Sequence, residues 1–285
     1  GDDSVAVNYG QITTHRSVGM DLSDAEFGTL INYGTINATD TGIYSSGFLL
    51  ESDVVNAHLE NHGSLNSNST TAAAISVEAS GAVYTLNTGL VSGRFAAYQS
   101  KYSATDTVDN SGVFQGDVLL GAGDDVYTAF DGGIVLGVID GGLGNDTLTG
   151  GSNADFMDGG DDNDRLFGRG GDDDLRGGLG SDFMSGGIGD DQLIGDDGSD
   201  KMFGGSGDDT LNGGRDKDTI YGGDGADEIK GGRLNDVLNG GAGADVFVYG
   251  VEQDSSTGAS DVIQDFEVGI DTIDLSGVAS GLTFV

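Results

Sequence analysis

Aspartate residues in the second half of the chain recur at a fixed interval of nine residues, a spacing that suggests metal chemistry. Carboxylate oxygens in turns that lack histidine and cysteine are hard ligands, and they favour calcium. Magnesium is the poorer candidate because it gives up its bound waters reluctantly. We therefore interpret these side chains as calcium ligands. They are Asp146, Asp155, Asp164, Asp173, Asp182, Asp191, Asp200, Asp209, Asp218, Asp227, Asp236 and Asp245.

The aspartates belong to twelve consecutive nine-residue units that fill residues 141–248 without an insertion. Position 1 is glycine and position 6 is aspartate in every unit, and position 8 is always a large apolar residue. Glycines at positions 1, 2 and 4 permit positive φ and close backbone approach, so that each turn can expose carbonyl oxygens to a cation. Residues 120–128 fit the same pattern except at their first position, and they add Asp125 to the candidate ligands. The candidate carbonyl ligands are Gly142, Gly144, Gly160, Gly178, Gly180, Gly187, Gly189, Gly205, Gly207, Gly223, Gly225, Gly241 and Gly243.

A short strand around position 8 should follow each turn, so that two units make one thin coil of turn, strand, turn and strand. Aspartates two units apart would then stack about 4.8 Å apart, and such a column of like charges requires cations between its members. The twelve turns alternate between two sides of the coil, which leaves room for about ten ions. Residues 141–248 carry 24 acidic and 8 basic side chains, a net charge of −16 that about ten Ca²⁺ ions would offset. A metal-free solenoid with aspartate used only as a turn residue is the alternative.

Six positions depart from the glycine pattern of the turns. Asparagine and aspartate tolerate left-handed backbone, whereas leucine is expected not to. We therefore expect the turn that contains Leu234 to bind calcium poorly. The departures are Arg169 and Asp196 at position 2, and Asn153, Asp162, Asp216 and Leu234 at position 4.

The composition excludes several classes of protein. The 285 residues include 54 glycines and no cysteine, which rules out a disulfide scaffold and cysteine-ligated metal sites. The net charge of −37 argues against binding nucleic acid or an anionic membrane by charge alone. No apolar run approaches the length of about 18 residues that a transmembrane helix needs. Regularly spaced hydrophobic residues, 36% of the chain, predict an ordered protein.

An Asn-x-Gly element recurs through the first 115 residues at intervals of 24, 29, 26 and 23 residues. Short β-branched runs fill each interval, and none shows the 3.6-residue period of a helix. The pattern predicts at least five coils of a right-handed β-helix, with the asparagines (Asn8, Asn32, Asn61, Asn87 and Asn110) stacked as an amide ladder. The residues between asparagine and glycine should stack at the same corner, either as ordinary turn residues or as an aromatic strip that contacts sugar or protein. These are Tyr9, Tyr33, His62, Thr88 and Ser111.

The predicted fold class is therefore all-β, a right-handed parallel β-solenoid. We expect a parallel β-helix over residues 1–119, a transition coil over 120–140, a β-roll of twelve nonapeptides over 141–248 and a strand-rich cap over 249–285. The cap consists of a polar loop at residues 253–260 followed by an alternating apolar segment, and it would cover the open end of the repeats.

The nonapeptide GGxGxDx(apolar)x resembles the calcium-binding repeat of RTX (repeats-in-toxin, or hemolysin-type) proteins of bacterial type I secretion, a parallel β-roll motif. Residues 261–276, DVIQDFEVGIDTIDLS, are similar to the cap of serralysin-type proteases and alginate epimerase modules. The resemblance implies that each Ca²⁺ is bound by position-6 aspartates and backbone carbonyls of two turns. It also implies export without an N-terminal signal and folding that is triggered by extracellular calcium.

No catalytic constellation is evident in the sequence, and we expect a protein that is not an enzyme. The histidines His15, His58 and His62 form no HExxH zinc motif, although the last two are spaced by four residues. The cations Arg16, Arg94 and Lys101 of the N-terminal half are scattered between coils. The chain has no proline, so it lacks the Asp-Pro-His signature of the epimerases that it resembles.

These observations predict a secreted, calcium-binding structural or adhesive protein at the cell surface, such as a surface-layer, matrix or filament component. Expected partners are Ca²⁺ and further copies of the chain or other extracellular proteins, with polysaccharide as an alternative. One alternative is an accessory carbohydrate-binding module of a secreted polysaccharide-active enzyme, such as an alginate epimerase or lyase. Another is a fragment of a pore-forming toxin, although no amphipathic segment supports it. The chain begins as if within another repeat, so we expect it to be a segment of a larger protein.

Overall fold

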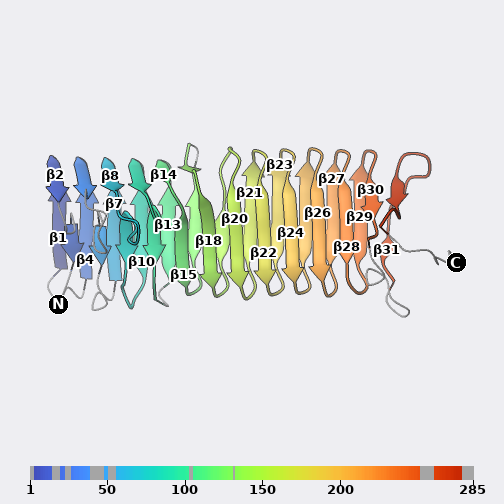
Figure 1. The fold of residues 1–285 in the computed structure, drawn as a ribbon, viewed down its shortest axis with the longest axis horizontal. Helices are drawn as coiled ribbons and strands as arrows, with labels where there is room; N and C mark the ends of the chain where they lie inside the picture. The colour runs from blue at the N-terminus through green and yellow to red at the C-terminus, as the bar shows by residue number, and fades with distance from the viewer. Residues whose placement is uncertain are drawn as a thin grey trace. The chain divides into compact units, whose positions relative to one another are not determined.

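The computed structural model describes residues 3–14, 20–22, 27–38, 48–50, 56–102, 105–130, 132–250 and 260–277. These residues form strands and turns and contain no helix, as Figure 1 shows, which confirms the predicted all-β class. The chain divides into two compact units, residues 1–161 and 162–285. Each unit is a parallel β-solenoid, as predicted. A helix long and apolar enough to span a membrane is not found within the described ranges.

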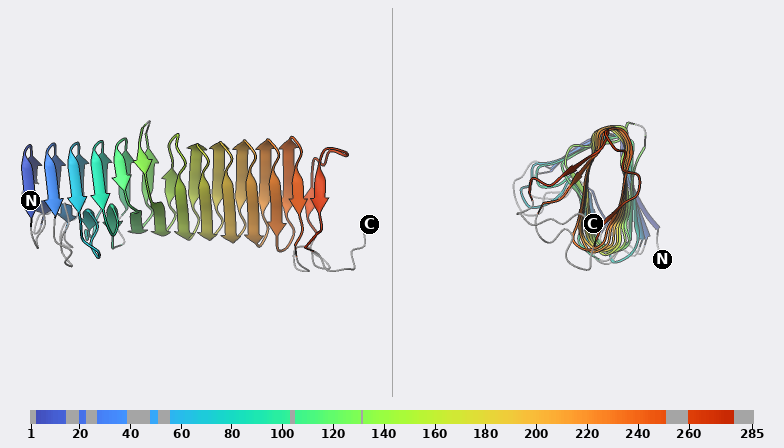
Figure 2. Two further views of the ribbon diagram at one scale, coloured as in Figure 1. Left: turned by 45° about the horizontal axis from the view of Figure 1, so that its top comes forward. Right: turned by 90° about the vertical axis from the view of Figure 1, so that its right-hand side faces the viewer.

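The N-terminal unit (residues 1–161) contains three parallel sheets, and its first six coils each contribute one strand to every sheet (Figure 2). Sheet A consists of β1 (Asp3–Asn8), β4 (Phe27–Asn32), β7 (Asn56–Asn61), β10 (Val83–Asn87), β13 (Asp106–Asn110), β16 (Val126–Ala129) and β19 (Thr147–Thr149). Sheet B consists of β2 (Gln11–Thr14), β5 (Thr35–Ala38), β8 (Ser64–Ser67), β11 (Leu90–Gly93), β14 (Val113–Gln115) and β17 (Ile134–Val135). Sheet C consists of β3 (Met20–Leu22), β6 (Phe48–Leu50), β9 (Ile75–Val77), β12 (Tyr98–Ser100), β15 (Val118–Ala122), β18 (Val138–Leu143) and β20 (Phe156–Asp161).

Rows of apolar side chains fill the three-sided coils. Alternate residues of a strand point to opposite faces, so one residue in two enters the core. Leu59 on sheet A, Leu65 on sheet B and Ile75 on sheet C are fully buried in the same coil. Burying a side chain of this size contributes roughly 1.5–3 kcal/mol. The N-terminal unit therefore has an apolar core of its own.

The predicted asparagine ladder is confirmed at the corner between sheets A and B. Each amide Nδ2 donates to the Oδ1 of the next asparagine, over 2.8 Å from Asn8 to Asn32 and 2.9 Å from Asn32 to Asn61. The ladder continues through Asn87 to Asn110, whose own Nδ2 donates to the Tyr127 hydroxyl. These buried amides bind one another because an unpaired polar group at this depth would destabilise the fold.

The described residues of the C-terminal unit (162–250 and 260–277) form two sheets, and each nonapeptide supplies one strand. Sheet D consists of β21 (Arg165–Gly170), β23 (Phe183–Ile188), β25 (Lys201–Ser206), β27 (Thr219–Asp224), β29 (Val237–Ala242) and β31 (Val262–Ile263). Sheet E consists of β22 (Asp174–Leu179), β24 (Gln192–Asp197), β26 (Thr210–Arg215), β28 (Glu228–Gly232), β30 (Val246–Val248) and β32 (Thr272–Asp274). Paired residues are two units apart, as in Met184 with Met202, and each strand of the repeats buries one large apolar side chain.

Left-handed backbone is found where the repeats depart from glycine. Asp162, Arg169, Asp196 and Asp216 have φ between 72° and 78°. Leu234 has φ of 78°, so the expectation that leucine would not adopt this conformation is wrong. The ladder bonds of the flanking coils hold the turn in place, at a cost of roughly 1–2 kcal/mol for the strained residue.

The predicted boundaries at residues 119, 140 and 248 do not coincide with the division into two units. The transition segment contains β16, β17 and parts of β15 and β18, and it forms most of the sixth three-sided coil. Two strands of the predicted cap, β31 and β32, continue sheets D and E. Several residues singled out in the sequence lie outside the described residues, namely Gly1, Asp2, His15, Arg16 and residues 253–259 and 278–285.

Candidate metal centres

The position-6 aspartates are buried at the start of the strands, with exposed fractions of 4% or less. In the C-terminal unit they form two columns, one beside each sheet. The column beside sheet D contains Asp164, Asp182, Asp200, Asp218 and Asp236, and the column beside sheet E contains Asp173, Asp191, Asp209, Asp227 and Asp245. Burying so many carboxylates requires hydrogen-bond donors or cations.

From Asp182 and Asp191 onward, one carboxylate oxygen of each column member accepts a backbone hydrogen bond from the aspartate of the coil before it. The N–H of Asp182 donates to Oδ1 of Asp200 over 2.8 Å, and the N–H of Asp200 donates in the same way to Asp218. At the end of the columns the backbone N–H of Asp236 donates to Oδ1 of Asp261 over 3.1 Å, and the backbone N–H of Asp245 donates to Oδ1 of Asp271 over 3.2 Å. These bonds fix the orientation of the accepting carboxylates, and the strands on either side hold the donors at coil spacing.

The second carboxylate oxygen is the feature that points to a ligand. In seven column members and in Asp125 of the N-terminal unit, Oδ2 is buried and has no hydrogen-bond partner among the described residues. A buried acceptor without a partner costs roughly 1–3 kcal/mol, and more if it is charged. A column of such oxygens is therefore unfavourable in isolation and suits a bound cation. The eight are Asp125, Asp182, Asp191, Asp200, Asp209, Asp218, Asp227 and Asp245.

The position-1 glycines leave the space into which Oδ2 points. A Cβ atom at Gly204 would lie 2.3 Å from Oδ2 of Asp209 and 2.6 Å from the carbonyl oxygen of Gly222 in the next coil. Position-1 glycines are absent from the described residues with positive φ. At position 1 the prediction of positive φ is therefore wrong, whereas the prediction of close approach is confirmed, because glycine leaves space for a carboxylate and a backbone carbonyl oxygen.

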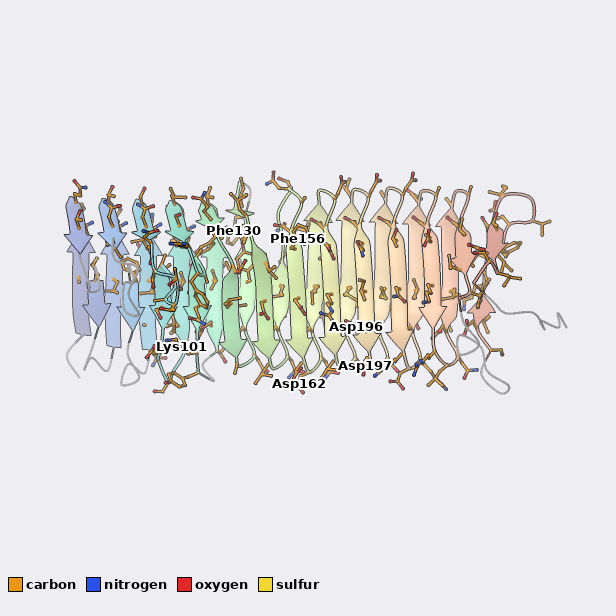
Figure 3. All side chains as sticks on the ribbon, viewed as in Figure 1. Lys101, Phe130, Phe156, Asp162, Asp196 and Asp197 are labelled. Carbon is orange, nitrogen blue, oxygen red and sulfur yellow. The ribbon has the colours of Figure 1, made fainter. Side chains whose placement is uncertain are left out.

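Apart from Gly151, the glycines at positions 2 and 4 of the repeats do have positive φ, as predicted, and their carbonyls point along the stack. A Cβ at Gly205 would lie 2.2 Å from the oxygen of Gly187, and one at Gly207 would lie 2.0 Å from the oxygen of Gly189. Figure 3 shows Asp162 and Asp197 at the turns along one edge of the coils. Each turn therefore brings together oxygen atoms only, which is the donor set that calcium prefers.

Asp155 differs from the other position-6 aspartates. Its Oδ2 accepts a hydrogen bond of 2.9 Å from the N–H of Gly151 in its own turn. Gly151 and Asn153 are not among the residues with left-handed backbone. The second repeat thus forms a different turn, in which a backbone donor occupies the carboxylate oxygen.

Burial raises the pKa values of these carboxyl groups, because loss of hydration disfavours the charged form more than the backbone hydrogen bond stabilises it. The pKa rises to about 7 for Asp200 and Asp209 and to about 8 for Asp218. Without a cation the columns would hold protons near neutral pH. A divalent ion would displace those protons and stabilise the ionised form.

Three further aspartates continue the columns and were missed in the sequence. Asp106 is fully buried, donates its N–H to Oδ1 of Asp125 over 2.7 Å and accepts a hydrogen bond from the Tyr98 hydroxyl. Asp261 and Asp271 take the same place in the last coil. The available signal was an aspartate followed two residues later by an apolar residue, a triplet that persists where the nine-residue spacing fails.

The described residues do not form a metal site from histidine or clustered carboxylate side chains alone. Among the described residues no group of three or more His, Cys, Asp or Glu side chains could hold a metal ion. His58 and His62 lie on the outer surface of the N-terminal unit, and each binds one oxygen of Glu60, at 2.7 and 3.0 Å. Both Glu60 oxygens are therefore already occupied. Any metal site in the columns must combine carboxylate with backbone oxygens.

Comparison with known proteins places most of the chain in one family. The family model described as the serralysin C terminal of peptidase M10 matches residues 52–285, which include the whole C-terminal unit and the N-terminal unit from residue 52 onward. A search of curated proteins finds no match.

Proposed function

The chain belongs to the peptidase M10 serralysin C-terminal family, a family of calcium-binding β-rolls in secreted proteins, and from this premise we propose a secreted structural or adhesive protein whose folding and assembly depend on Ca²⁺. The observation that carries the proposal is the column of buried carboxylate oxygens without protein partners. The columns need an ion that is abundant outside cells and scarce inside, so the protein would become rigid only after export.

We assign the calcium ligands to the position-6 aspartates with unpartnered Oδ2 atoms and to the backbone carbonyls of the glycine turns. The position-1 carbonyl of the following coil, such as that of Gly222 beside Asp209, joins the carbonyls of positions 2 and 4. Successive coils then share each ion, and about ten ions would fill the repeats. Asp155 is the weakest candidate, because its second oxygen already accepts the Gly151 N–H.

A structural or adhesive role is supported by the regular outer surfaces of the coils. Each sheet presents a flat face with one residue of each row per coil, which suits repeated contacts with a polymer or with neighbouring molecules. We include the absence of catalysis in the proposal. Its support is that the sequence has no catalytic motif and that the titratable side chains of the outer face, such as Glu60 and its histidines, bind one another.

Light scattering after size-exclusion chromatography tests the assembly role. We expect species of high mass in calcium and their loss in a chelator. A variant with Asp200→Ala and Asp209→Ala should bind fewer ions per chain, measured by elemental analysis after dialysis. A protein that remains monomeric in calcium at all concentrations would contradict the structural role, whereas an unchanged ion count would contradict the assigned ligands.

A further inference from the structure

Sheet B of the N-terminal unit carries no charged residue in any of its strands, β2, β5, β8, β11, β14 and β17. In a chain with 48 acidic and 11 basic residues this neutrality is specific to one face. Sheet A, by contrast, contains His58, Glu60 and Asp109, and sheet C contains Asp140 and Asp158. The outer face of sheet B is thus built from hydroxyl, amide and apolar groups alone.

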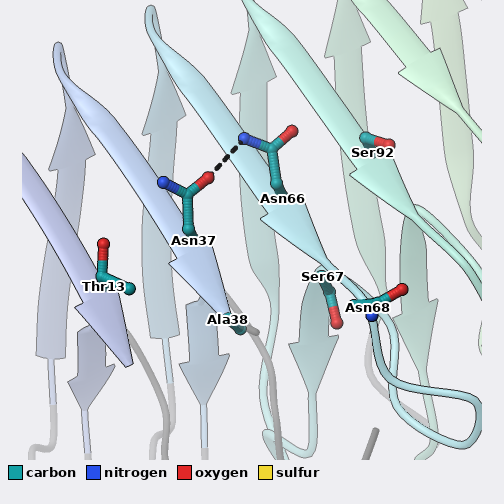
Figure 4. Close-up of a pocket in the computed structure, with 7 residues that line it drawn as sticks. All are labelled: Thr13, Asn37, Ala38, Asn66, Ser67, Asn68 and Ser92. Atoms are coloured by element: carbon teal, nitrogen blue, oxygen red, sulfur yellow. Dashed lines mark hydrogen bonds between the residues drawn. The ribbon is translucent and has the colours of Figure 1, made fainter. Parts of the chain in front are cut away.

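A shallow groove runs across four strands of this face, and Figure 4 shows the side chains that line it. Its axis is a row of outward side chains at equivalent places in successive coils: Thr13, Asn37, Asn66 and Ser92. The groove has a volume of about 370 Å³ and is completed at one side by Ala38, Ser67 and Asn68. The row therefore presents one polar side chain per coil over four coils.

The side chains of the row are held in place from within the sheet. The inward neighbours Ile36, Leu65 and Val91 are fully buried, which fixes the outward direction of the alternate residues. Asn66 Nδ2 donates to Asn37 Oδ1 over 2.9 Å, so the two amides share one orientation. Such a row presents ordered donors and acceptors before any ligand arrives, which reduces the entropy lost on binding.

The chemistry of the groove selects its ligand. Amides and hydroxyls both donate and accept hydrogen bonds, as sugar hydroxyls do, and an ionic polymer would find no opposite charge there. The strand spacing of about 4.8 Å places one hydroxyl or amide side chain per coil at roughly the length of one sugar ring. We propose that this groove binds an uncharged polysaccharide whose chain runs along the stack of coils. The inference rests on the extracellular role proposed above and names its partner.

The aromatic strip considered in the sequence is less suited to this role. Tyr9 and Tyr33 stack at 5.2 Å with an interplanar angle of 4°, and Tyr33 stacks on His62 at 4.8 Å. The predicted corner stack is thus confirmed, but the rings cover one another. The facing surfaces, which a sugar would need for stacking, are already buried against the neighbouring ring.

Affinity electrophoresis of the whole chain in calcium tests the proposal. The gels contain hydroxyethylcellulose, dextran or galactomannan as neutral polymers, or hyaluronate as a charged one. We expect slower migration in at least one neutral polymer and no retardation in hyaluronate. Asn66→Asp should weaken that binding by about tenfold or more, because it places a charge in the groove.

Gln99→Glu supplies the matched control, because it introduces the same charge on β12 of sheet C. It should leave binding unchanged, and circular dichroism should show that both variants fold. The inference is overturned if no neutral polymer retards the wild-type protein, if hyaluronate retards it more, or if both variants bind alike. Light scattering of the same samples keeps the two proposals apart, because assembly without glycan binding contradicts only this inference.

Discussion

The two units form parallel solenoids by different means. A three-sided coil of the N-terminal unit uses 19 to 29 residues and encloses apolar side chains from three sheets, and most of these coils add an asparagine to the ladder. A two-sided coil of the C-terminal unit uses two nonapeptides and encloses little more than one large apolar side chain from each. Ordering the backbone costs roughly 1–2 kcal/mol per residue in either case. In the N-terminal unit the burial of apolar side chains offsets this cost. In the C-terminal unit apolar burial is smaller, and we expect cations bound to the carboxylate columns to supply the remaining stability.

Removal of calcium should have the largest effect, and it should affect the two units differently. In a chelator we expect the backbone amides of the C-terminal repeats to lose their protection from exchange, because the buried carboxylate oxygens would have no cation to bind. The coils around Leu59 and Leu65 should retain much of their protection. Hydrogen exchange followed by mass spectrometry, peptide by peptide, measures both. Equal loss in both units would show that the apolar core cannot support the three-sided coils alone.

Acidification should partly replace calcium. The pKa of Asp200 is raised to about 7 and that of Asp218 to about 8, from 3.8, so the folded columns bind more protons than the unfolded chain between these values. The stability of the metal-free C-terminal unit should therefore be greatest below about pH 4 and fall as pH rises towards 8. Urea titrations of chelated protein from pH 4 to 8 measure this slope. A slope of opposite sign would mean that the aspartates are ionised in the metal-free fold.

A cavity in the apolar core should destabilise the two units with a different dependence on calcium. Leu59→Ala should cost about 2–5 kcal/mol through lost burial and the cavity that remains. We expect the loss with and without calcium, since no aspartate column adjoins this coil. Leu193→Ala on β24 is the matched change in the C-terminal unit, and its effect should be measurable only in calcium. Denaturant unfolding of both variants, with and without calcium, gives four changes in the free energy of unfolding. A cost of Leu59→Ala that depends on calcium would contradict the independent stability of the N-terminal unit.

A methyl group in the carboxylate space should affect the C-terminal unit at one coil. Gly204→Ala places Cβ 2.3 Å from Oδ2 of Asp209, and we expect a loss of roughly 1–3 kcal/mol together with weaker calcium binding. Gly10→Ala is the control, because no atom lies within 4 Å of its added Cβ. Calcium titration by calorimetry compares the two variants. Similar affinities would show that the position-1 space does not form part of the site.

The smallest effect should come from the strained turn. Leu234→Gly relieves a left-handed conformation and removes a side chain that is 41% exposed, so we expect a gain of about 1 kcal/mol. Leu234→Ala retains Cβ and should give no such gain. Thermal unfolding in calcium measures both, and a gain from alanine alone would locate the effect in the exposed leucine side chain instead of the backbone.

Much of this architecture follows from short-range patterns in the sequence. Position 8 predicts the buried residues and position 6 the columns, because a coil of two nonapeptides brings equivalent positions together. The place of Asp106 could not be obtained in that way, since its coil has no nonapeptide and only the fold brings it beneath Asp125. The different turn at Asp155 also escaped, because its sequence departs from the pattern at Asn153 alone. The neutral groove of sheet B depends on rows that form only once coils of unequal length are aligned.

The column bonds of the C-terminal repeats join residues 18 positions apart, from Asp164 with Asp182 to Asp227 with Asp245. Loss or gain of 18 residues would leave every ladder in register, whereas a change of nine would move all later strands to the opposite sheet. Asp261 and Asp271 would then face the wrong columns, and the row formed by Phe203 and Tyr221 would be interrupted. The length of such a protein can therefore be inherited or engineered only in whole coils.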